Sequence, residues 1–439
     1  MMEKTLLLGV LMALLPWLAG AQTVTDLAAL KGLAPIAMLA KTPGGNEALA
    51  SNYVVTGGLQ NGTLRQADLL PFADQQQLAL RDAFITGADL AELADGLGTT
   101  LGSAYLARAH YIDPSHFTSL SPAVASVIAT AVATSGANSG SAKCFFANAT
   151  TNGKTPVSAE AMKILQETGG DTDIFGKSYG LPAGSPGADS YGNSRPFQNE
   201  PSIAPIVGPD YFNVPADNLV YSRGPLMNLV DSPSFPSGHT TYGYTGALLL
   251  AILVPERYQQ MIVRGAEYGN DRILVGAHYA MDVIGGRTLA LYDMAHLLAD
   301  DPAYVNQDFQ AAIRAARADM VAALAAACGK SAAEGAREDT GRFSNAAADE
   351  AFYDSTQTYG LAIVYPENAD KIEDVGKLTP EAGRLLTAAF PSLTLEQADR
   401  ILTETEGPGG GFLDNGSAFG VYSRLNLYAA AGRAAALGN

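Results

Sequence analysis

The chain is organised around residues 234–254, which read SFPSGHTTYGYTGALLLAILV. The apolar run from Ala247 to Val254 predicts a packed helix, and the tetrapeptide Pro236-Ser237-Gly238-His239 places backbone NH groups near its start. The first turn of a helix has unpaired NH donors and the positive end of the helix dipole. This stretch therefore predicts an anion-binding site at a helix N-terminus, with His239 beside it.

A second group of polar residues follows about forty residues later, within another helical pattern. His278 and Asp282 are four residues apart, so the carboxylate can reach one imidazole nitrogen and leave the other directed at a ligand. Arg272 adds a planar guanidinium suited to phosphate-like oxygens. Gly285-Gly286 would permit close helix packing behind His278. Two histidines, an arginine and a phosphate-sized nest indicate phosphoryl-group chemistry, with one histidine as nucleophile and the other as acid.

These residues resemble the signature of the type 2 phosphatidic-acid phosphatase and vanadium haloperoxidase superfamily: Lys-x6-Arg-Pro, Pro-Ser-Gly-His and Ser-Arg-x5-His-x3-Asp. The second block is complete at 236–239, and the third departs from the pattern only at its leading Ser, which is Asp271. The first block has Arg195-Pro196, but Ala188 stands where the lysine is expected. Lys177, which precedes a Gly-, Pro- and Ser-rich stretch that looks like an insertion, is the candidate for that lysine.

The resemblance implies an all-α fold with a helical bundle core and a phosphatase mechanism. His278 would attack phosphorus and form a phosphohistidine, Asp282 would orient it, and His239 would protonate the leaving group. No metal and no other cofactor is expected, because cationic side chains do the work of a metal. The phosphate oxygens would be held by Arg195, Ser237, Gly238, Arg272 and Lys177.

Two other functions remain compatible with the same residues. In the haloperoxidase branch of the superfamily this pocket binds vanadate, which then serves as a cofactor that activates peroxide. A non-catalytic phosphate-binding protein would also keep the pocket, and the displaced lysine and Asp271 are its support.

The chain begins with a pattern typical of a secretory signal peptide. Lys4 precedes an apolar run from Thr5 to Leu18, and Ala19-Gly20-Ala21 forms a cleavage pattern. An uncleaved anchor helix is the alternative, but the run is short for a bilayer span. No other segment reaches the roughly eighteen apolar residues that a span needs. The sequence therefore predicts a secreted or periplasmic protein, with residues 1–21 removed, that is more similar to the periplasmic acid phosphatases than to the membrane-bound branch.

The composition excludes some partners. The net charge is −17, which would repel nucleic acid and anionic membrane surfaces. A small phosphorylated substrate would need a local basic pocket. The oligomeric state is left open. Cys144 and Cys328 could form one disulfide or remain two buried thiols, and the sequence does not decide between them.

Three regions are expected along the chain: the signal peptide 1–21, a helical phosphatase domain 22–300 with its motifs at 177–286, and an accessory helical region 301–439 that packs on the core or restricts access to it. With 439 residues, of which 47% are hydrophobic, the chain can bury a large core. Arg257 and Arg264 are expected to face solvent, although Arg264 is close enough to the third block for a supporting role.

A long Gly-, Pro- and Tyr-rich stretch, Gly169 to Pro233, is expected to form a loop that builds the rim of the site. Its aromatic residues either stack on the leaving group of a substrate or pin the loop down, and the two interpretations have equal support. These residues are Tyr179, Tyr191, Phe197, Tyr211, Phe212 and Tyr221.

Overall fold

The computed structural model describes residues 26–64, 67–82, 90–109, 111–113, 116–117, 120–200, 229 and 231–438. These residues are mostly helical, and the all-α fold class expected from the sequence is confirmed. The described strands are a short antiparallel pair, β1 (Tyr111–Asp113) and β2 (His116–Phe117). The predicted signal peptide lies outside the described residues. None of the described helices is both long enough and apolar enough to cross a bilayer.

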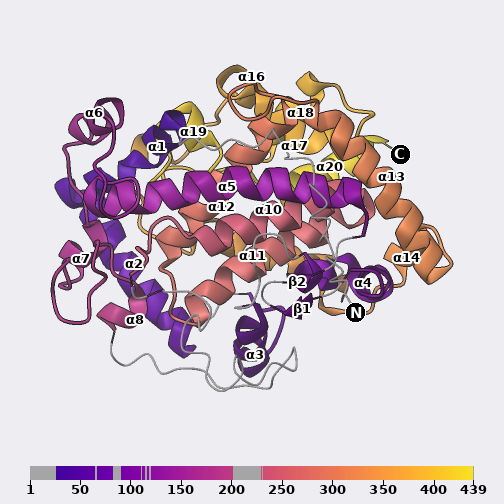
Figure 1. The fold of residues 1–439 in the computed structure, drawn as a ribbon, viewed down its shortest axis with the longest axis horizontal. Coiled ribbons are helices and arrows are strands. Elements are labelled where there is room, and N and C mark those ends of the chain that lie inside the picture. The colour runs from indigo at the N-terminus through magenta and orange to yellow at the C-terminus, as the bar shows by residue number, and fades with distance from the viewer. Residues whose placement is uncertain are drawn as a thin grey trace, which may run out of the picture.

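Three buried helices form the centre of the molecule, and a long fourth helix crosses them (Figure 1). They are α10 (Gly238–Leu253), α11 (Tyr258–Leu274) and α12 (Ala280–Leu298), crossed by α5 (Pro122–Asn148). Almost every residue of α10, α11 and α12 is buried, which explains why the first of them reads as a continuous apolar run. The predicted helix start is also correct, since Ser237 caps α10 by accepting a hydrogen bond from the Thr240 NH.

Glycines let these helices approach each other closely. A Cβ atom at Gly286 of α12 would lie 2.5 Å from the Ser237 carbonyl oxygen, and one at Gly285 would lie 2.6 Å from the Phe235 ring. A Cβ atom at Gly243 of α10 would fall within the Tyr268 ring of α11. The close packing predicted from Gly285-Gly286 is therefore present, and it fixes α10 against the first turns of α12.

The remaining N-terminal elements lie on two sides of this core, with α1, α2, α6, α7 and α8 on one side and α4 on the other (Figure 1), and α2 caps α12. The Asn52 side chain accepts a hydrogen bond from the Met281 NH, and the Thr56 hydroxyl accepts one from the Ala280 NH, which satisfies donors in the first turn of α12. The elements are α1 (Leu27–Leu33), η1 (Ala34–Lys41), α2 (Pro43–Asn61), α3 (Phe72–Asp82), η2 (Ala91–Leu97), α4 (Gly98–Leu106), α6 (Ala159–Glu167), α7 (Ile174–Ser178) and α8 (Pro196–Asn199).

The C-terminal region is joined to the same core. The buried guanidinium of Arg287, on α12, donates hydrogen bonds to the carbonyl oxygens of Thr356, Gln357 and Ser423. Among the described residues, buried side chains from Ala29 to Ala434 form a continuous cluster. The elements of this region are η3 (Pro255–Arg257), which joins α10 to α11, then α13 (Phe309–Cys328), α14 (Ala332–Arg337), η4 (Arg342–Ser344), α15 (Ala346–Thr358), η5 (Pro366–Asn368), α16 (Val375–Leu378), η6 (Pro380–Gly383), α17 (Arg384–Thr387), α18 (Leu395–Glu404), α19 (Ala418–Val421) and α20 (Leu427–Gly438).

The fold decides the open question of the cysteines and corrects the expectation for two arginines. Cys144 and Cys328 are both unpaired thiols and only partly buried. Arg257 and Arg264 do not face solvent: Arg257 is buried beside Asp339, and Arg264 is fully buried. Arg264 has one partner nearby in the sequence, Glu267, but Asp82 and Asp95, and Asp339 beside Arg257, come from distant segments that the helical pattern does not indicate.

Candidate active site

His278 and Asp282 form the pair predicted from their spacing. The His278 Nδ1 atom lies 3.2 Å from the Asp282 Oδ2 atom, and both side chains are fully buried. The same carboxylate accepts hydrogen bonds from the Tyr279 NH, at 2.8 Å, and from the Ser234 hydroxyl. Burial raises the pKa of Asp282 to about 7, while these two hydrogen bonds favour its charged form. The carboxylate thus fixes the orientation of the imidazole.

The other ring nitrogen of His278 faces a cation. The Arg195 Nη1 atom lies 3.0 Å from the His278 Nε2 atom. A guanidinium only donates hydrogen bonds, so Nε2 acts as the acceptor and the ring proton resides on Nδ1, towards Asp282. Burial, reinforced by Arg195 and Lys143, holds the pKa of His278 well below its ordinary value. The ring is therefore neutral, with a lone pair on Nε2.

His239 lies opposite, in the first turn of α10. Its ring centroid is 5.8 Å from that of His278, and the ring planes are inclined at 64°. Burial lowers the pKa of His239 well below its ordinary value, and the nearby Arg272 and Arg195 guanidinium groups lower it further. The two imidazoles that the sequence placed in separate blocks therefore lie together.

Two arginines from separate blocks supply the positive charge at this site. Arg195 caps α8 and donates from Nε to the Ser232 carbonyl oxygen, at 2.7 Å, and from Nη1 to the Ala277 carbonyl oxygen, at 2.9 Å. Arg272 is fully buried near the end of α11, where its Nη2 donates to the Ala79 carbonyl oxygen at 3.1 Å. These backbone contacts hold both guanidinium groups in place, although the chain as a whole is strongly acidic.

The Pro-Ser-Gly-His turn is fastened to the helix that carries Asp282. The Ser237 NH donates to the Asp282 carbonyl oxygen at 3.0 Å, and the Ser237 hydroxyl accepts from the Thr240 hydroxyl at 2.8 Å. Gly238 leaves room at the start of α10, since a Cβ atom there would lie 3.4 Å from the Lys143 Cε atom.

Lys143 is the residue that sequence reasoning missed. It projects from α5, and its Nζ donates to the Pro233 carbonyl oxygen at 2.6 Å and to the Ser234 carbonyl oxygen at 3.3 Å. Burial and the nearby Arg195 lower the pKa of Lys143 well below its ordinary value. A lysine inside a mostly apolar helix was the available sign, because such a residue needs a buried partner.

Lys177, the lysine chosen from the sequence, occupies a different place. It is exposed on α7, and its charge acts on the Asp173 carboxylate. It was chosen because it precedes Arg195 along the chain, but separation along the chain does not measure distance across a fold. The geometry favours Lys143 over Lys177 as the lysine of the site.

Asp271, which stands in place of the signature serine, is buried against other carboxylates. Burial, and then the charge and hydrogen bond of Asp82, raise the pKa of Asp271 well above its ordinary value. Asp82 itself forms a two-point ion pair with Arg264, at 2.6 Å for each hydrogen bond. The raised pKa favours the protonated form of Asp271, which is part of a polar network that joins α3 to α11 next to Arg272. This network gives Arg264 the supporting position expected for it.

Three aromatic residues of the predicted rim loop lie among the described residues: Tyr179, Tyr191 and Phe197. Tyr179 pins the loop, because its ring stacks on Phe175 with centroids 5.5 Å apart and its hydroxyl accepts from the Asn52 side chain at 2.8 Å. Three others, Tyr211, Phe212 and Tyr221, lie outside the described residues. The donors gathered at the site are cationic or neutral, which suits an oxyanion such as phosphate or vanadate.

Comparisons with known proteins agree with this geometry. Residues 186–299 match the model of the PAP2 superfamily. A stretch of 64 residues is 45% identical to a non-specific acid phosphatase of Salmonella typhimurium, and it covers 15% of this chain and 26% of that protein. A stretch of 87 residues is 37% identical to an acid phosphatase of Zymomonas mobilis, and it covers 20% of this chain and 33% of that protein. A stretch of 84 residues is 34% identical to a non-specific acid phosphatase of Providencia stuartii, and it covers 19% of this chain and 32% of that protein.

The chain therefore spans about a quarter to a third of the length of these curated relatives. The matched residues 186–299 contain Arg195, the Pro-Ser-Gly-His turn and the His278–Asp282 pair. The family resemblance of the three sequence blocks is thereby confirmed: residues 186–299 of this chain match the PAP2 superfamily.

Proposed function

We propose that this protein hydrolyses phosphomonoesters, as an acid phosphatase that uses His278 as a covalent nucleophile. The observation that carries the proposal is the state of the His278 ring. Its Nδ1 proton is held by Asp282, its Nε2 lone pair accepts from Arg195, and the centroid of the second imidazole, His239, lies 5.8 Å from its own. A neutral imidazole with one nitrogen anchored and a lone pair on the other is the form required for attack on phosphorus, and a bound phosphate would take over the hydrogen bond that Arg195 donates to Nε2.

In the first step, the His278 Nε2 lone pair forms a bond to phosphorus as the bond from phosphorus to the ester oxygen breaks. His239 gives a proton to the departing oxygen, which leaves as an alcohol. The imidazolium that develops on His278 is stabilised by Asp282. His239 must carry a proton for this step, and a bound phosphate dianion would raise its pKa by offsetting the cations that lower it.

In the second step, His239 is neutral and takes a proton from a water molecule, whose oxygen attacks the phosphohistidine. The bond between nitrogen and phosphorus breaks, and inorganic phosphate leaves. The equatorial oxygens carry the negative charge in both transition states, so fixed donors around them lower the barrier. We assign this role to Arg195, Arg272, Lys143 and the backbone NH groups at the start of α10.

Replacement of the nucleophile tests this proposal. We expect a His278→Ala variant to lose at least about three orders of magnitude in kcat for an aryl phosphate, because no other described group takes the place of Nε2. The matched control is His296→Ala. His296 also pairs with a carboxylate, since its Nδ1 lies 2.7 Å from the Asp301 Oδ2 atom, but the pair lies towards the other end of α12. It should keep wild-type activity. Near-normal turnover by His278→Ala would refute the mechanism.

Independence from metal ions and the alternative haloperoxidase activity need separate assays. We expect hydrolysis to continue in EDTA, because the proposed transition state is stabilised by side-chain cations. Oxidation of bromide by peroxide in the presence of vanadate would instead favour the haloperoxidase branch, although the relatives named above are phosphatases. We also propose secretion, which mass spectrometry would test by finding Gln22 as the first residue of the exported protein.

A further inference from the structure

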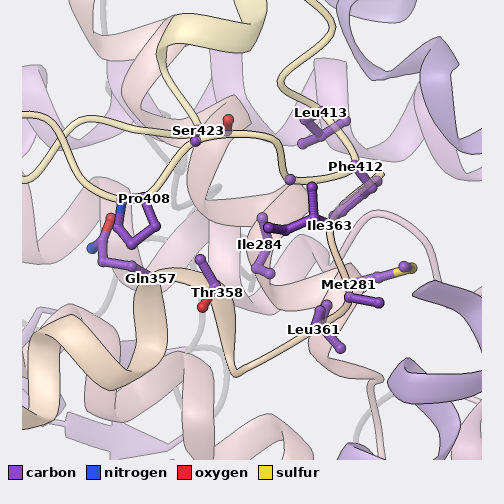
Figure 2. A pocket seen from close by; sticks show the side chains of 13 residues that line it. Met281, Ile284, Gln357, Thr358, Leu361, Ile363, Pro408, Phe412, Leu413 and Ser423 are labelled. Atoms are coloured by element: carbon purple, nitrogen blue, oxygen red, sulfur yellow. The ribbon is translucent and has the colours of Figure 1, made fainter. Parts of the chain in front are cut away.

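A cavity of about 240 Å³ has a lining that includes neither imidazole of the site nor any residue of the Pro-Ser-Gly-His turn. It is lined by residues of the first turns of α12, the end of α15 and the segment after it, and the loop 408–413, and Figure 2 shows the side chains that line it. Met281 and Ile284, the lining residues from α12, lie on either side of Asp282 in the sequence. The other lining residues are mostly apolar, and none of them is charged.

Gln357 gives this apolar cavity one polar group. Its side chain lines the cavity and is 4% exposed, and neither atom of its amide has a hydrogen-bond partner. The Gln357 side chain moderates the raised pKa of the neighbouring Tyr353 hydroxyl, but the contact between them lacks the geometry of a hydrogen bond. Figure 2 shows Gln357 and Met281 at opposite ends of the view. A buried amide without partners costs about 1–3 kcal/mol, and a ligand that both donates and accepts hydrogen bonds would remove that cost.

The walls of the cavity are held in place by hydrogen bonds. The Gly410 carbonyl oxygen accepts from the NH groups of Val364 and Tyr365, at 2.8 and 3.0 Å, and the Gly410 NH donates to the Asp414 carboxylate at 2.6 Å. At Gly411, which lines the cavity, an added Cβ atom would meet no other atom within 4 Å. The space is therefore already open, so binding would require little rearrangement.

One wall of the cavity is in contact with the residue that precedes the Pro-Ser-Gly-His turn. The Phe412 ring packs edge-on against the Phe235 ring, with centroids 6.2 Å apart. Phe235 immediately precedes the Pro-Ser-Gly-His turn and also packs against Gly285 of α12. An occupant of the cavity would thus touch residues that support both His239 and Asp282.

We infer that this cavity binds a small neutral molecule that has an apolar body and one terminal group able to donate and accept hydrogen bonds, such as a primary carboxamide. The apolar lining supplies the contact for the body, and the Gln357 amide matches the terminal group. A charged ligand is disfavoured, because no lining residue would compensate for the loss of its hydration. The inference does not depend on the proposed phosphatase activity.

Hexanamide is a suitable probe, measured by calorimetric titration and by thermal unfolding of the whole chain. We expect the wild-type protein to bind it, with Tm raised by about 2–5 °C at a hundredfold excess over Kd. In Gly411→Leu the new side chain occupies the cavity, so binding should be lost without a fall in Tm. Gly411→Ala fills less space and should weaken binding partially, which keeps the test valid if the leucine variant folds poorly.

Two controls define the specificity. Gly140→Leu adds the same side chain on the exposed face of α5, where nothing lies within 4 Å, and it should bind hexanamide as the wild type does. Ionised hexanoate should bind at least tenfold more weakly than hexanamide, and Gln357→Leu should reduce that preference. Absence of hexanamide binding to the wild type, or equal binding by Gly411→Leu, would overturn the inference whether or not the protein is a phosphatase.

Discussion

Gly286→Ala tests whether the close contact of α12 with the Pro-Ser-Gly-His turn positions that turn. The added methyl group would lie 2.5 Å from the Ser237 carbonyl oxygen and 3.1 Å from the Thr240 Cβ atom. That carbonyl oxygen already accepts hydrogen bonds from the Thr241 NH, at 3.0 Å, and from the Thr241 hydroxyl, at 2.9 Å. An ordinary contact begins at 3.4 Å, so the start of α10 must move by about 0.9 Å, and His239 must move with it.

The expected magnitudes follow from two opposing effects. Alanine stabilises a helix by about 1 kcal/mol relative to glycine, whereas overpacking a tight core costs about 1–3 kcal/mol. The net loss of stability should therefore be about 0–2 kcal/mol, and the protein should still fold. Catalysis should suffer more, because a displacement of about 1 Å at a catalytic group costs on the order of a hundredfold in rate.

The assay compares Gly286→Ala with Gly140→Ala, in urea unfolding and in kcat for an aryl phosphate. Gly140 lies in the long helix α5, where an added Cβ atom meets nothing within 4 Å. The control should gain up to about 1 kcal/mol in unfolding free energy and keep its kcat. If Gly286→Ala behaves in the same way, the close contact of α10 and α12 does not position the site, and this reasoning is wrong.

Three further predictions concern the charged and titrating groups. Lys143→Met should lower kcat/KM for an aryl phosphate by about 10²–10³, as for other lost donors to a transition-state oxyanion, whereas Lys177→Met should change it by less than about twofold. His239→Ala should slow turnover and let a phosphoenzyme accumulate, which rapid acid quenching of a radiolabelled substrate would detect; a variant with normal turnover would remove its role as the acid. Because the pKa of Asp271 is raised, the folded state keeps a proton that the unfolded chain releases above about pH 3.9. The contribution of Asp271 to stability is therefore complete at low pH, and it is lost as the pH rises through the folded pKa. In Asp271→Asn the amide still donates to Asp82 at every pH, so unfolding free energies should fall less between pH 5 and pH 9 than in the wild type; an unchanged slope would contradict a protonated Asp271.

The local parts of the site could be read from the sequence because they depend on short separations along the chain. The pairing of His278 with Asp282 follows from their helical spacing, and the Ser237 cap follows from its place before an apolar helix. The glycines at 285 and 286 indicated close packing for a similar reason, since a helix position without a side chain allows another segment to approach the backbone closely.

The sequence by itself therefore determined an all-α fold, the two histidines and most of the residues around them. Only the tertiary structure placed Lys143 of α5 beside the Pro-Ser-Gly-His turn, and only it buried Arg264 against Asp82 of α3. The physical reason is the same in both cases. A charged side chain is stable in the interior when distant segments supply its partners, and the order of residues along the chain does not say which segments will meet.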